Sequence, residues 1–270
     1  MIAVIVPIYN TEKYLRETID SVICQTLSFA EHIRLILLDD ASTDGSFAIC
    51  EQYQKQYPKQ IVVKHYDTNQ GVSALRNEGV RIAGEMGDEL ITFLDSDDKL
   101  ADDAVEKAVQ YFDAHEDVFV AAIGIRYFDA YEGEQRLNWR FEKTDVVDIK
   151  KDYTYPHYYV GGVFLRHAVL DELHFDESLS FWEDALAVNQ VIVSQGKYGL
   201  IAGTHYYYRK REDESSLVDT AWHKKERYTT LLSSGYGQLF AYSRKKHHRI
   251  IPYVQYMVAY HMRLMMMKSK

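Results

Sequence analysis

The first 117 residues alternate between two kinds of block. Continuous apolar runs rich in Val, Ile and Leu predict buried β-strands. They lie at residues 2–9, 33–40, 61–67 and 89–95. The blocks between them have helical spacing, as where Leu15, Ile19 and Val22 fall on one face. Strands that alternate with helices predict an α/β fold, with a mostly parallel sheet flanked by helices.

The pattern changes after residue 117. A strand is expected at residues 118–129 and a helix from residue 183, but the other apolar pieces are short and mixed with Tyr and Trp. From residue 222 the chain is helical, basic and rich in Met. We therefore expect two halves, residues 1–117 and 118–217, followed by a basic helical C-terminal segment, residues 218–270. The last residues, "RLMMMKSK", contain no Gly or Pro stop signal, which predicts a piece of a longer protein.

Composition and charge narrow the functional classes. The chain has 270 residues, of which 47% are hydrophobic, so it can bury a sizeable core. Its two cysteines do not make a disulfide framework, and it has no secretion signal and no apolar run of about 18 residues, so a cytoplasmic location is expected. The net charge is −9, yet residues 222–270 carry ten basic residues and one acidic residue. The body is therefore acidic, which argues against nucleic-acid binding.

Polar side chains collect where the predicted strands end. These groups are Tyr9-Asn10, Asp39-Asp40, Asp67-Thr68-Asn69 and Asp95-Ser96-Asp97-Asp98. Because ligands of open parallel α/β sheets bind outside the carboxyl ends of the strands, the four groups are expected to line one crevice. Asp95 and Asp97, one residue apart, offer the oxygen ligands that Mg²⁺ and Mn²⁺ select beside a diphosphate. A cation would also relieve their mutual repulsion.

Six segments together resemble one enzyme family. "VPIYN", "LLDDASTDGS", "NQGVSALRNEG" and "ITFLDSDD", in this order and spacing, resemble the N-terminal half of the inverting glycosyltransferases of family 2, which have the Rossmann-like GT-A fold. "FWEDALAVNQVIVSQG" and "HYYYRKREDESS" are similar to later segments of that family. The resemblance implies a GT-A catalytic domain at residues 1–217, with a nucleotide-binding half and an acceptor half. Near the C-terminus, "YVQYMVAYHMRL" is similar to members that build capsule or teichoic-acid-like polymers of the bacterial surface.

The resemblance implies a nucleotide-sugar donor, most simply a UDP-sugar. The backbone near Pro7 and the ring of Tyr9 would flank the base. Asp40 would hydrogen-bond the base with Asp39 beside it, since a carboxylate accepts bonds from a base N–H. Arg76 would reach the base or the diphosphate, which arginine can bind in a bidentate way.

The residues after the fourth strand would complete the donor site. By resemblance, Asp95 takes the ribose hydroxyls and shares the metal with Asp97, while Ser96 lies between them in the donor site. Asp98 would lie behind these ligands or cap the next helix, and His205 is a further candidate metal ligand. The cation, Mn²⁺ or Mg²⁺, would act as a Lewis acid on the departing diphosphate.

Transfer also needs a base for the acceptor hydroxyl, and inversion places it across the anomeric carbon from the metal. The segment "SFWEDALAV" supplies two acids at a predicted helix start, where aromatic neighbours would raise a carboxyl pKa by desolvation. By resemblance, Asp184 is the base and Glu183 orients or binds the acceptor. Trp182 and Tyr159 are candidate acceptor-binding residues, because sugar rings present apolar C–H faces to aromatic side chains.

Three alternatives stay open for the C-terminal segment. It packs back on the catalytic domain, it joins a further domain or a second subunit, or it rests on the anionic inner face of a membrane as a peripheral contact. The family members that this segment resembles often use lipid-linked acceptors at that membrane face.

The sequence thus predicts a metal-dependent inverting glycosyltransferase. It would move a hexosyl or N-acetylhexosaminyl group from a nucleotide-diphosphate donor to a hydroxyl of a glycan, lipid-linked or polymer acceptor in surface polysaccharide synthesis. One alternative is a nucleotidyltransferase, but "PIYNTEKYL" lacks the Gly-rich basic loop that a triphosphate needs. The other is a non-catalytic sugar-binding scaffold with a transferase fold, which the intact Asp95, Asp97 and Asp184 oppose.

Overall fold

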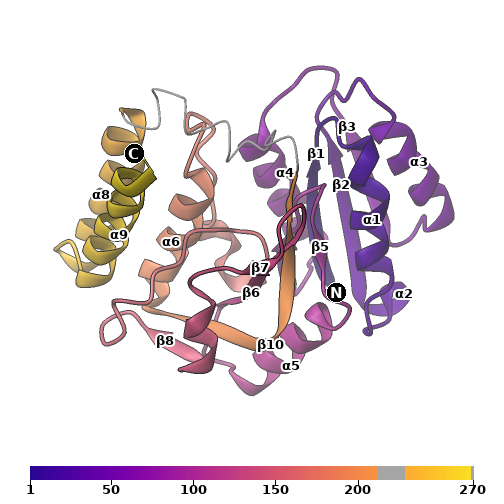
Figure 1. The fold of residues 1–270 in the computed structure, drawn as a ribbon. Coiled ribbons are helices and arrows are strands. Elements are labelled where there is room, and N and C mark those ends of the chain that lie inside the picture. Colours follow the sequence, from indigo (N-terminus) through magenta and orange to yellow (C-terminus); the bar gives the residue numbers. More distant parts are fainter. Residues whose placement is uncertain (212–228, 269–270) are drawn as a thin grey trace.

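The computed structural model describes residues 1–211 and 229–268, and within these ranges ten strands form one sheet (Figure 1). The strands are β1 (Ile2–Ile8), β2 (Ile33–Asp39), β3 (Ile61–His65), β4 (Leu90–Phe93), β5 (Lys99–Leu100), β6 (Val120–Asp129), β7 (Gly133–Glu134), β8 (Val146–Asp148), β9 (Val163–Arg166) and β10 (Lys197–Lys210). Their order across the sheet is β3-β2-β1-β4-β9-β6-β10-β5, with β7 beside β6 and β8 beside β10.

Helices cover the sheet, and short helical turns join its strands. The α-helices are α1 (Glu12–Ile23), α2 (Phe29–His32), α3 (Ser46–Gln56), α4 (Val72–Glu85), α5 (Ala104–Ala114), α6 (Glu183–Gln195), α8 (Gly237–His247) and α9 (Pro252–Lys268). The 3-10 turns are η1 (Asn138–Glu142) and η2 (His167–Glu172), and η4 (Leu231–Tyr236) is a π-helical turn.

The first half has the predicted architecture. Strands β3, β2, β1 and β4 are parallel, and every residue of β1 is buried, as a sheet covered on both faces requires. The pairing register sets Ile8 at the end of β1 against Asp39 at the end of β2. Helix α1 buries Leu15, Ile19 and Val22, the predicted apolar face. The carboxyl ends of these strands therefore meet at one edge, as expected.

Beyond β4 the sheet is mixed rather than parallel. Strand β9 runs antiparallel between β4 and β6, β10 is parallel to β6, and β5 is antiparallel to β10. Strand β10 was not predicted; its alternation is interrupted by a register shift between Ile201 and His205. It reaches from β8 at one end to β5 beside the aspartates of β4, so it links the two halves of the site.

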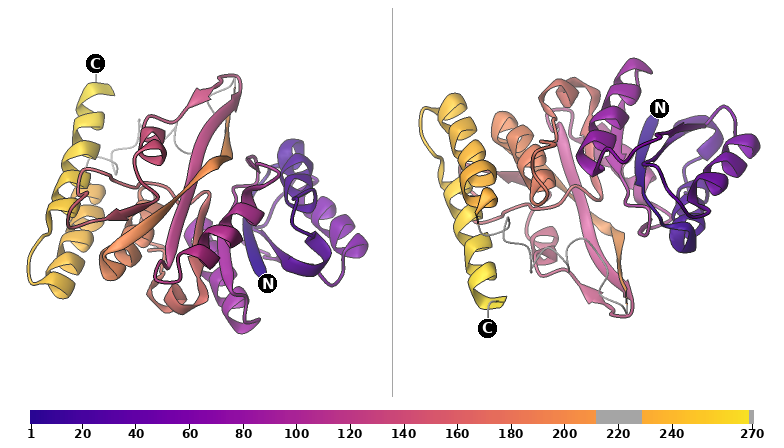
Figure 2. Two further views of the ribbon diagram at one scale, coloured as in Figure 1. Left: turned by 90° about the horizontal axis from the view of Figure 1, so that it is seen from below. Right: turned by 90° about the horizontal axis from the view of Figure 1, so that it is seen from above.

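The C-terminal helices pack on the same core as α6, which is the first of the three alternatives for this segment. Figure 2 shows α8 and α9 side by side at the α6 end of the molecule, away from α1 and α3. Tyr253, Val254 and Met257 of α9 are fully buried in the cluster that contains Leu186 and Val193 of α6. No described helix is both long and apolar enough to cross a membrane. The predicted boundary at residue 217 lies outside the described residues.

Candidate active site

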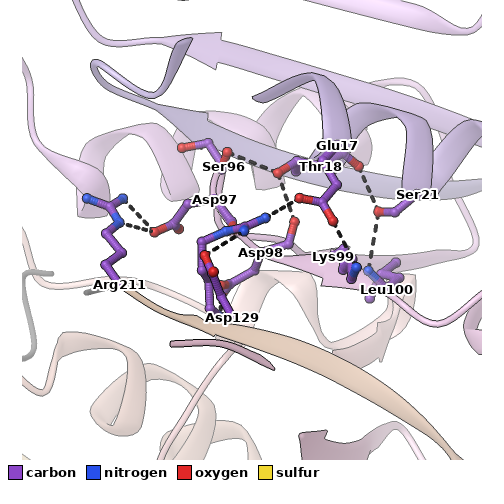
Figure 3. Close-up of polar contacts among 11 residues, drawn as sticks. Glu17, Thr18, Ser21, Ser96, Asp97, Asp98, Lys99, Leu100, Asp129 and Arg211 are labelled. Carbon is purple, nitrogen blue, oxygen red and sulfur yellow. Dashed lines mark hydrogen bonds and ion pairs between the residues drawn. The ribbon is translucent and has the colours of Figure 1, made fainter. Parts of the chain in front are cut away.

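The aspartates after β4 meet the end of β10 (Figure 3). Arg211 follows β10 directly, and its Nε and Nη2 donate to Asp97 Oδ2 at 3.0 and 2.5 Å. Arg209 donates its backbone N–H to Asp98 Oδ1 (2.7 Å) and its Nε–H to the Asp97 carbonyl (2.7 Å). Burial raises the pKa of Asp97, and the guanidinium of Arg211 opposes that rise. Asp97 therefore depends on a nearby positive charge to stay ionised.

Asp98 organises this loop from behind. It is buried, and its Oδ2 accepts a hydrogen bond from the hydroxyl of Tyr206 (2.7 Å), which itself accepts from the Asp95 N–H (3.1 Å). Burial and the neighbouring charge of Asp97 hold the pKa of Asp98 well above its usual range. Asp103 occupies the N-cap position of α5, so Asp98 does not cap this helix. The structure therefore supports the other role predicted for Asp98, a position behind the predicted metal ligands.

Arg76 joins the two groups of acids that the sequence places far apart. On α4, its buried side chain donates to Asp95 Oδ1 through Nη2 and to Glu183 Oε1 through Nη1, both at 3.1 Å. Its Nε is buried without a hydrogen-bond partner among the described residues. One cation thus links the end of β4 to the start of α6 and joins one member of each carboxylate pair.

Asp184 lies in the first turn of α6. Its Oδ1 accepts from the N–H of Ala185 at 2.6 Å. Burial raises the pKa of Asp184 to about 7, the charge of Glu183 adds to the rise, and Arg76 opposes it. A carboxylate with a pKa near neutrality matches the requirement for a general base.

At the ends of β1 and β2, the structure distinguishes Asp39 from Asp40. Both carboxylate oxygens of Asp40 have a partner, because they accept from the N–H groups of Gln70 (2.6 Å) and Gly71 (2.9 Å). Asp39 is buried; its Oδ2 bonds to His65 Nδ1 (2.7 Å), but its Oδ1 has no partner among the described residues. The unsatisfied acceptor of this pair is therefore on Asp39.

The other donor-side residues differ in exposure. The ring of Tyr9 is 52% exposed and lies at the end of β1, open to stacking, whereas Pro7 is buried inside that strand. Ser96 is buried, and its carbonyl accepts from Thr18 Oγ1 at 3.0 Å. Thr18 thereby ties the aspartate loop to α1.

Among the described residues, no three His, Cys, Asp or Glu side chains are grouped closely enough to hold a metal ion by themselves. Asp95 and Asp97 are the two predicted ligands that lie in one loop, and their side chains are 37% and 19% exposed. His205 lies on β10 and points its Nε2 toward Glu134 Oε1 at 3.9 Å. By strand alternation it faces away from Tyr206, whose hydroxyl meets Asp98. The structure therefore does not bring His205 to the aspartate pair.

The predicted acceptor residues are less open than expected. Trp182 is only 4% exposed because its ring packs under the C-terminal helices, so it offers no face to a sugar. The hydroxyl of Tyr159 accepts from Nη2 of Arg140 at 3.2 Å, and Arg140 is itself fully buried. Tyr159 keeps partial exposure. The structure thus does not support Trp182 as an acceptor surface.

Sequence reasoning did not anticipate that Tyr206, Arg209 and Arg211 contact the aspartate loop. The segment "HYYYRKREDESS" gave the resemblance and the candidate ligand His205, but nothing in it indicates a partner far upstream. The available signal was the alternation of Arg209 and Arg211, which places two cations on one face at a strand end.

Comparisons with known proteins identify the fold first. The complex of Staphylococcus aureus TarS 1-349 with UDP-GlcNAc superposes with a TM-score of 0.74 at 23% identity, over 91% of this chain and 67% of that one. The mannosyltransferase PcManGT of Pyrobaculum calidifontis, solved with GDP-Man and Mn²⁺, gives 0.65 at 18% identity, over 96% and 68% of the two chains. These likenesses show a GT-A-like fold.

The family follows from the sequence itself. The family described as glycosyl transferase family 2 matches residues 3–174, so this chain belongs to it, as the motifs predicted. The chain is also 42% identical over 98% of its length to the minor teichoic acid biosynthesis protein GgaA of Bacillus subtilis. It spans 59% of the length of GgaA.

Proposed function

We propose that this chain transfers a sugar, with inversion, from a nucleoside-diphosphate donor to a hydroxyl of a cell-wall glycopolymer of the teichoic acid type. Family membership supports glycosyl transfer, and similarity to GgaA supports this class of acceptor. The UDP-GlcNAc complex of TarS, a protein of the same fold, supports a UDP-sugar as the donor.

The observation that carries the proposal is the bridge made by Arg76. Glycosyl transfer needs a donor site and a base on opposite sides of one reacting carbon. Arg76 contacts Asp95, on the donor side, and Glu183, beside Asp184, with the same guanidinium. The two sets of acids are therefore neighbours, although one follows strand β4 and the other begins helix α6.

The residues present fit a divalent cation. Asp95 and Asp97 supply hard oxygen ligands, and diphosphate oxygens would complete the shell, as is usual for Mg²⁺ sites. The Arg211 guanidinium on Asp97 Oδ2 marks this as a place where positive charge is stabilised. A bound Mn²⁺ or Mg²⁺ would supply Lewis-acid stabilisation to the departing diphosphate.

In the donor site we assign the hydrogen bond to the nucleobase to Asp39 rather than Asp40. Both oxygens of Asp40 are already bonded to backbone N–H groups, whereas Asp39 Oδ1 is a buried acceptor with no partner in the part of the chain that the structure describes. Leaving such an acceptor unpaired is costly, so an N–H of the base is its natural complement. The exposed ring of Tyr9 would stack on the base from the neighbouring strand end.

Asp184 would take the proton of the acceptor hydroxyl as that oxygen attacks the anomeric carbon. Its raised pKa suits this role, since a base with a pKa near the working pH is effective while a substantial fraction of it is ionised. Glu183 is held by Arg76, so it orients the acceptor or Arg76 rather than competing for the proton.

The direct test is calorimetric titration of UDP, CDP and GDP with Mn²⁺ present, repeated with a chelator. We expect UDP to bind in a metal-dependent way, followed by transfer from one of a panel of UDP-sugars to purified teichoic acid. Preference for GDP or CDP would keep the enzyme class and change the donor. Failure of every nucleotide to bind would refute the proposal.

A further inference from the structure

The residue that precedes the two acids of α6 has an unusual backbone. Trp182 occupies the N-cap position of α6 with a φ of 71°, in the left-handed region. Bulky residues are rare there and persist only where their surroundings hold them. Trp182 also sets the start of the helix, because its carbonyl accepts the N–H of Leu186 at 3.0 Å.

The C-terminal helices hold the ring of Trp182. Tyr236 of η4 meets it edge-on with ring centroids 4.9 Å apart, and His261 of α9 stacks on it at 5.9 Å. A hydrogen bond of 2.6 Å joins the hydroxyl of Tyr236 to Nδ1 of His261. Gly235 lies so close that a Cβ there would sit 3.3 Å from Cε3 of Trp182. Two segments beyond β10 thus form one clamp around this ring.

The directions of both acids depend on this helix start. Glu183 reaches Nη1 of Arg76 at 3.1 Å, and Asp184 is bonded within its own first turn to the N–H of Ala185. A change in φ at Trp182 would rotate that first turn relative to the sheet. Glu183 and Asp184 would then turn away from Arg76 together.

We propose that Trp182 is a positioning residue for Asp184, and that Tyr236 and His261 keep it in its left-handed conformation. This inference rests on the proposed function, because it takes Asp184 as the general base. It gives the C-terminal helices a part in catalysis, although they lie outside residues 3–174 that match the family. A core tryptophan that merely packs would affect stability alone.

The first experiment compares Trp182→Ala with Trp182→Gly. Both remove the ring, but only glycine accepts a positive φ without steric cost. We expect kcat of the Ala variant to fall on the order of 10- to 100-fold, as for a small misplacement of a reacting group. The Gly variant should keep several-fold more kcat, and KM for the donor should stay unchanged in both. Equal kcat values for the two variants, or a loss confined to KM, would overturn the assignment.

A second pair separates the clamp from general stability. Tyr236→Phe removes the bond to His261, and Tyr253→Phe removes a comparable buried bond of α9, from the Tyr253 hydroxyl to Oδ1 of Asn189 (2.8 Å). Both should lower the melting temperature similarly. Only Tyr236→Phe should lower kcat, by about three- to tenfold, and only it should speed amide hydrogen exchange in the first turn of α6.

The outcomes distinguish this inference from the proposed function. If the wild-type chain binds no nucleotide and transfers no sugar, the proposed function fails, while hydrogen exchange still reports whether the clamp fixes the helix start. If the wild type is active but Tyr236→Phe matches Tyr253→Phe in kcat and exchange, the positioning role is wrong and the proposed function stands.

Discussion

The donor-side strands and the acceptor-side strands of this sheet differ in the range of their contacts. In the first half, neighbouring elements of the sequence pair or pack together, and β1, β2 and β3 are adjacent in the sheet. The contacts that join the two halves are distant in sequence: Arg209 meets Asp98 across 111 residues, and Arg76 meets Glu183 across 107. The difference teaches that the strand ends proposed to bind the nucleobase rest on a local scaffold, whereas the aspartate loop after β4 and the proposed base require the whole chain to be folded.

The largest expected effect is the loss of sugar transfer in a variant that keeps donor binding. We expect Asp184→Asn to lower kcat by about 10²- to 10⁴-fold, because the amide cannot accept the acceptor's proton. Binding of UDP with Mn²⁺ should change far less, since Asp184 makes no described hydrogen bond or ion pair to Asp95 or Asp97 and only its charge reaches Asp95. Calorimetry and a sugar-transfer assay on the same preparation measure both. Normal transfer by this variant would show that the base lies elsewhere.

The opposite result, a loss of donor binding, is expected for Asp97→Asn in the first half. Loss of the charged ligand should weaken metal-dependent UDP binding at least about 100-fold, since even residues that only support a metal ligand contribute up to that factor. Asp103→Asn is the matched control, because Asp103 pairs with Lys107 on the nearby helix α5. Titration of UDP at fixed Mn²⁺ compares them. Equal affinities for the two variants would remove Asp97 from the metal site.

The pH dependence sharpens the assignment of the base. Burial first, and then the charge of Glu183, raises the pKa of Asp184 to about 7, so the ionised form predominates only above that pH. We therefore expect kcat/KM to rise about tenfold per pH unit up to about pH 7 and to level off above it. Rates measured from about pH 5 to pH 9 at saturating Mn²⁺ would show this rise and the plateau above it. A flat profile through neutrality contradicts this role.

A smaller effect tests which of Asp39 and Asp40 hydrogen-bonds the nucleobase of the donor. Asp39→Asn should weaken UDP binding about 10-fold and reduce the preference for UDP over CDP, because one charged hydrogen bond to the base is lost. Asp40→Asn keeps an oxygen for one of its two backbone partners and should leave the nucleotide preference intact. Competition titrations with the two nucleotides distinguish the variants. A lost preference in Asp40→Asn alone would restore the original assignment of Asp40.

The smallest effect concerns Arg211. Since its guanidinium is paired with Asp97 Oδ2, a cation must compete with it, and Arg211→Gln should tighten Mn²⁺ binding without nucleotide by about two- to fivefold, the range of a partly exposed ion pair. Manganese titration followed by paramagnetic resonance provides the readout. Weaker binding in the variant would mean that Arg211 supports the metal site rather than competing with it.

The sequence predicted the fold of the first half well because its rules are local. Apolar strands and amphipathic helices alternate there, and the aspartates follow β2 and β4 directly, so the topology alone brings them together. The hydrogen-bond partners of Asp39 and Asp40 were less predictable. Which of the two has an unsatisfied oxygen depends on where the N–H groups of Gln70 and Gly71 fall, and the pattern of residues does not contain that information.

The second half was harder for a physical reason. Strand β10 carries the register shift and mixes Gly with Tyr, so its period of two is broken where the site begins. The burial of Trp182 results from helices that follow it by dozens of residues, which single-sequence reasoning cannot pair with it. The acidic pair Glu183 and Asp184 was proposed from the resemblance of its segment to the family, while the helix start that carries the pair was predictable as a local signal.

The left-handed residue Gly196 joins α6 directly to β10. This helix–strand hairpin therefore carries the proposed base near its start and Arg211 just past its end. Such a hairpin can be exchanged between relatives only as a whole, because one inserted residue in its strand would reverse the inward and outward sides beyond it. Tyr206 would then leave Asp98, and Arg211 would leave Asp97. Grafts meant to alter the proposed acceptor choice should accordingly be cut outside residues 183–211, so that the proposed base and the partner of Asp97 are inherited together.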